Sequence, residues 1–533
     1  MKMTLLIGGI SLPYTAPASE ALRRARRILN GVHLLSRETA LSVYRRSVDA
    51  RRRQDIRFVY TVAATDDFSP SIVQAHKNKF SVLKAESPRP TYGTLPLSAR
   101  PVVVGSGPCG LFCALLLAEN GYRPILLERG GTVEERKHAA HTLRTERRLD
   151  TNTNIQFGAG GAGTFSDGKL VTRINDPLCG YVLDTFVKMG APREITLLAK
   201  PHVGTDILSV IVTKMLERIS ALGGEVRYHT ALTDLVISSG KVIGIKTTEG
   251  ELACGALVLA VGHSARDTYR MLLSRGLSVE PKPFSVGLRI EHLQADIDRA
   301  LYGDAAGDPL LGAAEYHLSH NTHTRGVYTF CMCPGGEVVA ATSEDGGVVV
   351  NGMSNHSRDG KNANSAVVCS VFCEDYGATP EGAIAFQRRI EQAAYRAGGN
   401  DFSAPCVTVG DFLFGRVGTE PSRVLPTYMN GEGVRLSSPD AYLPSFVSEG
   451  IRAALPAFGR QIEGFDATDA VLTGAETRTS APIRLLRTED GRALGYENLY
   501  PAGEGAGYAG GITSAAVDGI RIALSLMAKY SAE

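Results

Sequence analysis

The chain has 533 residues, of which 44% are hydrophobic and 21% charged, a composition typical of soluble globular proteins of two or three domains. Its nine cysteines are an odd number scattered through a long sequence, which argues against a disulfide scaffold and favours reduced thiols in the cytoplasm. The net charge of +2 hides an asymmetry, because residues 1–100 carry 17 Lys and Arg against 7 Asp and Glu, so the remainder is net acidic.

Residues 1–87 mix strand-like and helix-like patterns and predict a small basic α+β domain. The run from Ala18 to Leu29 places apolar residues at helical spacing with arginines opposite, and residues 56–64 alternate as a strand does. We expect a solvated basic face. Binding of an acidic partner, an RNA or an anionic substrate stays open, with RNA disfavoured because no recognisable nucleic-acid module is present; the arginines concerned are Arg45, Arg46, Arg51, Arg52 and Arg53. Residues 88–100, rich in proline and polar residues, predict a linker.

From residue 101 the pattern becomes strand, glycine turn, helix and strand, the start of a nucleotide-binding βαβ unit. Gly105 permits the tight turn, Gly107 lets the backbone approach a pyrophosphate, and Gly110 lets helix and strand pack closely. The N-terminus of the helix then faces the phosphates. The next strand ends at Glu128, whose carboxylate can accept hydrogen bonds from ribose hydroxyls. This segment therefore predicts an adenosine half-site.

Two further glycine matches differ in their surroundings. The match at 158–163 lacks a preceding strand and a following apolar helix, so it is not a second Rossmann unit. The match at 505–510 follows a strand end with Glu504 and precedes a helix, which suits the ribityl and isoalloxazine end of a flavin. Two separated half-sites predict FAD rather than NAD, and NAD(P)H stays open only as a transient electron donor. The predicted FAD-binding residues are Gly105, Gly107, Pro108, Cys109, Gly110, Glu128, Arg129, Gly161, Ala162, Gly163, Thr164, Val226, Gly262, Gly503, Glu504, Gly511 and Ile512.

Long segments of the chain resemble a family of bacterial FAD-dependent dehydrogenases: GAGTFSDGKL, AVGHSARDTY, KPFSVGLRIEH, FCMCPGGEVV, NGMSNHSRDGKNANS, AETRTSAPIR and YPAGEGAGYAGGITSAAVDG. The likeness covers residues 101–533 and reaches into the N-terminal domain through RRSVDARRRQDIRFVYTV. It implies an α/β fold with a Rossmann-type FAD-binding domain of the glutathione-reductase-like kind, split between 101–280 and 471–533. An α+β substrate domain would be inserted at 281–470. The chain departs from the family pattern at Ala159, where the pattern has glutamate.

Three residues are candidates for chemistry at the flavin. Lys169, in FSDGKL, could stabilise negative charge on the flavin or on a substrate carboxylate, or lie with Asp167 in an ordinary surface turn. Arg478 could grip an anionic substrate through its guanidinium fork, or form an ion pair between domains. His263 follows a strand end near Arg266 and is a candidate proton carrier, although a lone histidine there is more often structural.

A polar group in the inserted region could line a substrate pocket. Arg289 and His292 alternate with apolar residues on a predicted strand, and the loop that follows is either pocket-lining or solvated, with Asn351, Ser354, Arg358, Asn362 and Asn364.

The C-x-C pair Cys331 and Cys333 precedes Pro-Gly-Gly, and we expect a β-hairpin with both cysteines on one face of its first strand. A strained disulfide is disfavoured, and so is a metal site, because only Cys369 and Cys373 lie near in sequence. A thiol that faces the flavin and a small buried apolar residue both stay open.

The sequence thus predicts a cytoplasmic FAD-dependent oxidoreductase, without a membrane span, that moves a hydride between flavin N5 and a small, anionic organic substrate. A flavin monooxygenase that uses NAD(P)H and oxygen is the first alternative. The second is an RNA- or protein-binding flavoprotein that docks through its basic N-terminal domain, and a redox partner protein stays open.

Overall fold

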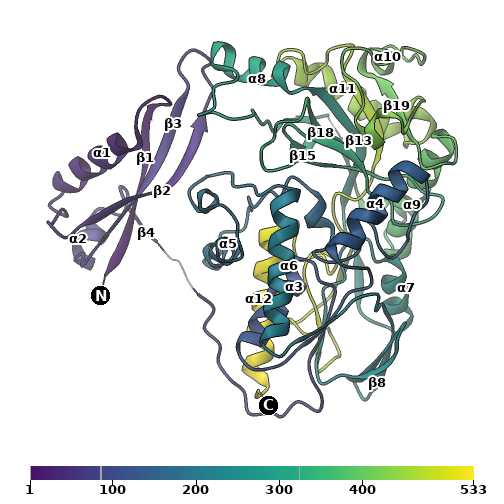
Figure 1. Cartoon of the computed structure of the whole chain (residues 1–533), viewed down its shortest axis with the longest axis horizontal. Helices are drawn as coiled ribbons and strands as arrows, with labels where there is room; N and C mark the ends of the chain where they lie inside the picture. Colours follow the sequence, from purple (N-terminus) through teal and green to yellow (C-terminus); the bar gives the residue numbers. More distant parts are fainter. Residues whose placement is uncertain (1, 84–86, 323, 533) are drawn as a thin grey trace.

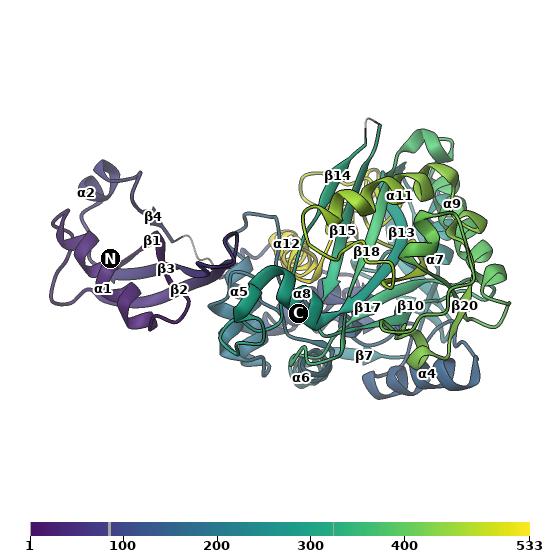
Figure 2. The same cartoon turned by 90° about the horizontal axis from the view of Figure 1, so that it is seen from above.

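The computed structural model describes residues 2–83, 87–322 and 324–532. The N-terminal part forms a four-stranded sheet in the order β2-β3-β1-β4, and Figure 2 shows it projecting from the rest of the molecule. Apolar residues of its helices pack on alternate residues of β1 and β3, as the periodicities predict. Its elements are β1 (Met3–Pro13), α1 (Ala18–Asn30), β2 (Ala40–Asp49), β3 (Arg57–Asp66), α2 (Pro70–Ala75) and β4 (Ser81–Val82).

A parallel sheet in the order β23-β11-β5-β6-β7 forms the centre of the main body. Side chains alternate between two covering layers: Val103 and Leu126 face the helices α3, α6 and α12, whereas Val102 and Leu127 face a small antiparallel sheet, β8 to β10. Figure 1 shows the three helices side by side. Strand β23 joins this sheet from near the end of the chain, beside β11.

The elements of this part, in chain order, are β5 (Val102–Val104), α3 (Pro108–Glu119), β6 (Ile125–Leu127), α4 (Val133–Glu146), α5 (Cys179–Lys188), α6 (Thr205–Ala221), β7 (Glu225–Arg227), β8 (Leu232–Ser238), β9 (Lys241–Thr247), β10 (Gly250–Ala253), β11 (Leu257–Leu259), α7 (Arg266–Ser274), β23 (Leu499–Pro501) and α12 (Ile512–Lys529).

A second, mixed sheet of seven strands has the order β14-β15-β18-β13-β21-β19-β20 and stands above the parallel sheet (Figure 1). Its core is shared with α8, α9 and α11. Its elements and their neighbours are β12 (Val279–Pro281), β13 (Phe284–Leu293), α8 (Gln294–Tyr302), β14 (Ser319–Asn321), β15 (Gly326–Cys333), β16 (Glu337–Ala340), β17 (Val350–Met353), β18 (Asn362–Val371), α9 (Pro380–Ala397), β19 (Ala404–Thr408), α10 (Val409–Leu413), β20 (Val434–Leu436), α11 (Ser445–Gly459), β21 (Val471–Glu476) and β22 (Ile483–Leu485).

Two features differ from the expectations. The return to the FAD-binding part, expected at residue 471, comes later, because β21 is hydrogen-bonded between β13 and β19 of the seven-stranded sheet. The hairpin expected around Pro334 is wrong: β15 pairs with β14 and β18, whereas β16 pairs with β17 in a separate two-stranded sheet. The turn forms, but long-range pairing selects other partners for the two strands that flank it.

Backbone hydrogen bonds tie the N-terminal part and the linker to the main body. Arg46 of β2 donates its N–H to the Leu197 carbonyl at 2.7 Å and accepts from the Ala199 N–H at 2.9 Å. In the predicted linker, the Leu95 carbonyl accepts from the Ser531 N–H at 2.9 Å, beyond the end of α12. Within the described part of the chain, no helix combines the length and the apolar character needed to cross a membrane.

Candidate cofactor and substrate site

One cavity of about 340 Å³ lies at the carboxyl ends of the parallel strands and reaches the seven-stranded sheet. Open α/β sheets bind ligands at this edge. The segments that follow all five strands of the parallel sheet contribute to its wall, and so does the end of β15. The cavity wall contains Lys169, Arg478 and His263, and of the predicted FAD-binding residues all but Gly110, Thr164, Val226 and Gly503.

The glycines of the first turn serve two purposes: two of them are needed for backbone packing, and one leaves open space at the start of α3. Gly105 has a φ of +97°, and an added Cβ would come within 2.3 Å of the Ala260 carbonyl oxygen. A Cβ on Gly110 would come within 1.8 Å of the Gly105 oxygen, so close packing of α3 on β5 requires glycine there. At Gly107, in contrast, the nearest atom to an added Cβ is the Gly161 Cα at 3.9 Å. Space therefore remains above Gly107, at the N-terminus of α3.

Glu128 is buried, and its hydrogen bonds hold the backbone segments that form the cavity wall near the start of α3. One carboxylate oxygen accepts from the N–H of Ser106 at 3.0 Å and from its hydroxyl at 2.6 Å. The other accepts from the N–H groups of Gly130 and Gly158, each at 3.0 Å. The predicted ribose contact stays a prediction, and the structure adds that Glu128 joins the two glycine loops to each other.

The second glycine run lies against the first. An added Cβ on Gly161 would come within 3.0 Å of the Gly107 Cα, and Gly160 donates its N–H to the Ser106 carbonyl at 3.1 Å. Arg136 of α4, fully buried, donates to the carbonyls of Asn154, Ile155, Ala159 and Gly161. Arg136 carries no signal in the sequence, because its carbonyl partners lie in an irregular loop that has no periodic pattern.

The opposite end of the cavity is formed by the N-terminus of α12. Gly511 precedes this helix and no side chain caps its first N–H groups. Glu504 lies beside it, and burial raises the pKa of its carboxyl to about 7. The Nδ1 atom of His263 lies 3.7 Å from the Glu504 carboxylate. Burial and the nearby charges of Arg478 and Arg266 lower the pKa of His263 to about 3. A neutral His263 is therefore a poor proton donor near pH 7, and Glu504 fits that role better.

Arg478 belongs to a buried ion-pair cluster that joins the two sheets. Its Nη2 lies 3.1 Å from one Glu391 carboxylate oxygen, and its Nη1 donates to the Ser343 hydroxyl. Arg266, at the start of α7, donates to both oxygens of the same Glu391 carboxylate at 2.7 Å, and to Glu344 at 2.9 Å. These contacts support the ion-pair alternative, since they occupy the guanidinium that would grip a substrate.

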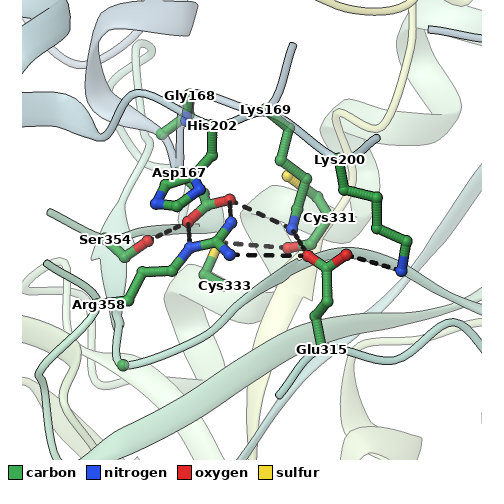
Figure 3. A network of polar contacts seen from close by, with 12 residues as sticks. Asp167, Gly168, Lys169, Lys200, His202, Glu315, Cys331, Cys333, Ser354 and Arg358 are labelled. Atoms are coloured by element: carbon green, nitrogen blue, oxygen red, sulfur yellow. Dashed lines mark hydrogen bonds and ion pairs between the residues drawn. The ribbon is translucent and has the colours of Figure 1, made fainter. Parts of the chain in front are cut away.

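Lys169 lies in a second charged cluster, which Figure 3 shows from close by. Its ammonium is 3.2 Å from Asp167 and 3.3 Å from Glu315, and Glu315 also accepts from Lys200 at 2.7 Å. Burial disfavours the charge on Lys169, but the two carboxylates outweigh that effect and raise its pKa. The surface-turn alternative is wrong, because Asp167 is fully buried and paired with Arg358.

The polar residues of the inserted region divide between the cavity and the core. Arg289 is fully buried and pairs with Glu476 at 3.0 Å, and Asn351 lines the cavity. Ser354 and Arg358 bind Asp167, so the solvated-loop alternative does not hold for them. The core members are His292, which lies 2.7 Å from the Phe465 carbonyl, and Asn362 and Asn364 on β18.

Four predicted cofactor residues lie outside the cavity wall. Val226 pairs with Leu126 inside the parallel sheet, so its cofactor contact stays a prediction, and the wall beyond β7 is made by Thr230, Ala231 and Leu232. The rule that ligands lie beyond the carboxyl ends of strands would have found these three. Gly110 and Gly503 serve packing, and Thr164 borders a small neighbouring cavity.

Cys331 lines the cavity, whereas Cys333 is fully buried. A hydrogen bond from Cys333 lowers the pKa of the Cys331 thiol to about 7; burial opposes this shift and the charges of Arg289 and Lys169 support it. For Cys179, on α5, burial raises the pKa above its ordinary value.

Because only the thiolate is nucleophilic, alkylation of Cys331 by iodoacetamide is expected to rise with a midpoint near pH 7. Cys179 serves as the internal control and should need a distinctly higher pH to react, because burial raises its pKa. Mass spectrometry of peptides from the purified protein, labelled across a pH series, measures both. A Cys331 midpoint as high as that of Cys179 would contradict the assignment.

The residues of the cavity fit a dinucleotide. Two helix N-termini without side-chain caps, those of α3 and α12, line one continuous space. Such termini bind phosphate groups and stabilise developing negative charge. The open cradle above Gly107 leaves room for a pyrophosphate against the backbone.

Comparisons with known proteins agree with this fit. Residues 283–479 match the family described as "FAD-dependent protein, C-terminal domain-like". An uncharacterized protein from Clostridium beijerinckii is 45% identical over 497 residues, which cover 92% of each chain. Among solved structures, L-amino acid deaminase from Proteus vulgaris is 14% identical, covers 83% of this chain and 96% of its own, and has a TM-score of 0.33. A flavin-dependent brominase is 12% identical, with coverages of 80% and 79% and a TM-score of 0.38. The two structural likenesses are too distant to inform on substrate.

Proposed function

Because the chain belongs to this family of FAD-dependent proteins, which confirms FAD as its cofactor, we propose that it moves a hydride between flavin N5 and a small, anionic organic substrate. Bound FAD supplies the hydride chemistry, and the protein supplies binding, orientation and charge.

The observation that carries the proposal is the continuity of one cavity. Its wall includes the phosphate cradle at Gly107, the acid Glu504, and the charged groups Lys169 and Asp167. The groups that we propose for the cofactor and for the substrate therefore line one space, as hydride transfer requires. We propose that Gly107 and Glu128 hold the adenosine end, and that Gly511 and Glu504 adjoin the flavin ring.

Lys169 is proposed to anchor the anionic group of the substrate. Its cluster combines three cations, Lys169, Lys200 and Arg358, with two carboxylates, Asp167 and Glu315, and so keeps a net positive charge. The carboxylates on either side hold the ammonium in place at the cavity wall. Glu504 is proposed to carry the proton, since a carboxyl that titrates near pH 7 can both give and accept one.

Replacing Lys169 with methionine is expected to raise the KM for an anionic substrate roughly 10- to 100-fold, because a charge-assisted hydrogen bond is lost. The measurement is anaerobic bleaching of the bound flavin by a panel of small 2-hydroxy and 2-amino acids, each compared with its methyl ester. Lys200→Met is the comparison variant, for which we expect a smaller rise in KM, since Lys200 contacts the same Glu315 but is 62% exposed.

Equal bleaching by acids and esters, or an unchanged KM in Lys169→Met, would contradict the anchoring role. NAD(P)H oxidation that depends on an aromatic compound and yields a hydroxylated product would point to the monooxygenase alternative instead.

A further inference from the structure

The end of β15 departs from regular strand geometry where it reaches the cavity. Pairing with β18 shifts register between Phe330 and Cys333, and Cys331 lies in that bulge with a φ of +46°. A cysteine in the left-handed region is unusual, and such outliers cluster at functional sites. The bulge breaks the alternation expected of the strand, so that Cys331 faces the cavity and Cys333 lies behind it.

The two thiols lie close together along the chain in this bulge. Both are free, and the Cys333 Sγ lies 3.3 Å from the Cys331 carbonyl oxygen. In a regular strand a disulfide between residues one position apart is strained, which is why the sequence disfavours it; the register shift and the left-handed backbone at Cys331 replace that regular geometry.

Two cations lie near the pair, and each is also bound to carboxylates. Arg289, paired with Glu476, donates to the Cys331 carbonyl at 3.0 Å, and its Nη1 lies 4.0 Å from the Cys333 sulfur. Lys169, paired with Asp167 and Glu315, lines the same cavity and favours the Cys331 thiolate. Cationic surroundings and partial exposure to a cavity are typical of reactive cysteines rather than of inert, buried ones.

We propose that Cys331 and Cys333 form a redox-active dithiol that exchanges two electrons with the FAD in the shared cavity. In the oxidising direction the two S–H bonds break and one S–S bond forms. The two electrons and two protons pass to oxidised FAD, which becomes the two-electron-reduced form. In the reverse direction, electrons that a substrate has delivered to FAD reduce the disulfide. This inference rests on FAD as the cofactor, and it adds a second store of electrons to the proposed hydride transfer.

Anaerobic reductive titration of the air-oxidised, FAD-loaded protein tests the proposal. Wild type is expected to take up about four electrons per flavin, two into FAD and two into the disulfide. Cys331→Ser and Cys333→Ser should each take up about two, because neither can form the disulfide. Cys179→Ser, a control with its thiol on α5 outside the cavity wall, should behave as wild type.

A second readout does not depend on the flavin. After denaturation in the presence of an alkylating agent, the peptide that contains β15 should carry no label in the oxidised protein and two labels in the reduced protein. Wild-type uptake of about two electrons, or two labels on this peptide in the oxidised protein, overturns the proposal. Loss of the flavin spectrum in wild type would instead refute the FAD assignment, so the two failures are distinguishable.

Discussion

Gly107→Val is expected to abolish FAD retention while the protein still folds. The backbone at Gly107, with φ −68° and ψ 179°, is ordinary extended structure that valine adopts readily. A new Cβ would meet no protein atom closer than 3.9 Å, so the added methyl groups enter the cradle at the N-terminus of α3. A pyrophosphate would then lose its approach to the backbone N–H groups. We expect FAD affinity to fall by roughly 100-fold or more, about 3 kcal/mol.

Flavin absorbance of the purified protein and flavin release on denaturation measure this effect, and the apparent melting temperature of flavin-free protein reports on folding. Gly180→Val is the matched control, because Gly180 lies exposed near the start of α5 with nothing within 4 Å of an added Cβ. It should keep its flavin. Gly110→Val should instead prevent correct folding, since the added Cβ would overlap the Gly105 carbonyl oxygen. Full flavin occupancy in Gly107→Val would refute the cradle.

Glu391→Gln is expected to destabilise the protein by about 3–5 kcal/mol. The substitution keeps the shape of the side chain but removes the charge that both Arg266 and Arg478 bind, and it leaves two buried guanidinium groups poorly compensated. Glu463→Gln is the control: Glu463 pairs with Arg53 but is 83% exposed, and such pairs contribute at most about 1 kcal/mol.

The pH dependence of stability gives a second, independent test of the role of Glu391. The nearby guanidinium groups outweigh its burial and hold the pKa of the Glu391 carboxyl well below its usual range. Its contribution is therefore present above the unfolded pKa of about 4.3 and is lost as the pH falls further. Apparent melting temperatures across an acidic pH series should decline more steeply in wild type than in Glu391→Gln. Similar melting temperatures for the two proteins at neutral pH would contradict the role of the cluster.

Local patterns predicted the parts of the site that are local in sequence. The strand, the turn from Gly105 to Gly110 and the acid Glu128 lie within one βαβ unit, where spacing alone limits the geometry. The ion pair of Arg478 with Glu391 joins the segment after β21 to α9, and no short motif connects these two parts of the sequence. The sequence therefore left Arg478 open between a substrate contact and an ion pair.

The cysteine pair shows a different limit of prediction from local sequence patterns. Period-two alternation predicts side-chain direction only while a strand keeps its register, and the bulge before Cys333 breaks that register. Pro334 and the glycines after it signalled a turn correctly, but not which strand pairs with β15. Pairing partners are selected by burial across the whole sheet, which a local pattern does not contain.

The attachment of the N-terminal part has a practical consequence for truncated forms of the protein. Arg46 binds the backbone on both sides of Leu198, and Lys200, two residues further on, holds Glu315 beside Lys169. Deleting residues 1–87 would therefore remove the support of a segment that orients a charge at the cavity wall. Lower activity in such a shortened protein would not by itself show that the basic domain recruits a partner. Charge-reversal variants of its exposed arginines, which leave the Arg46 backbone contacts in place, separate recruitment from scaffolding.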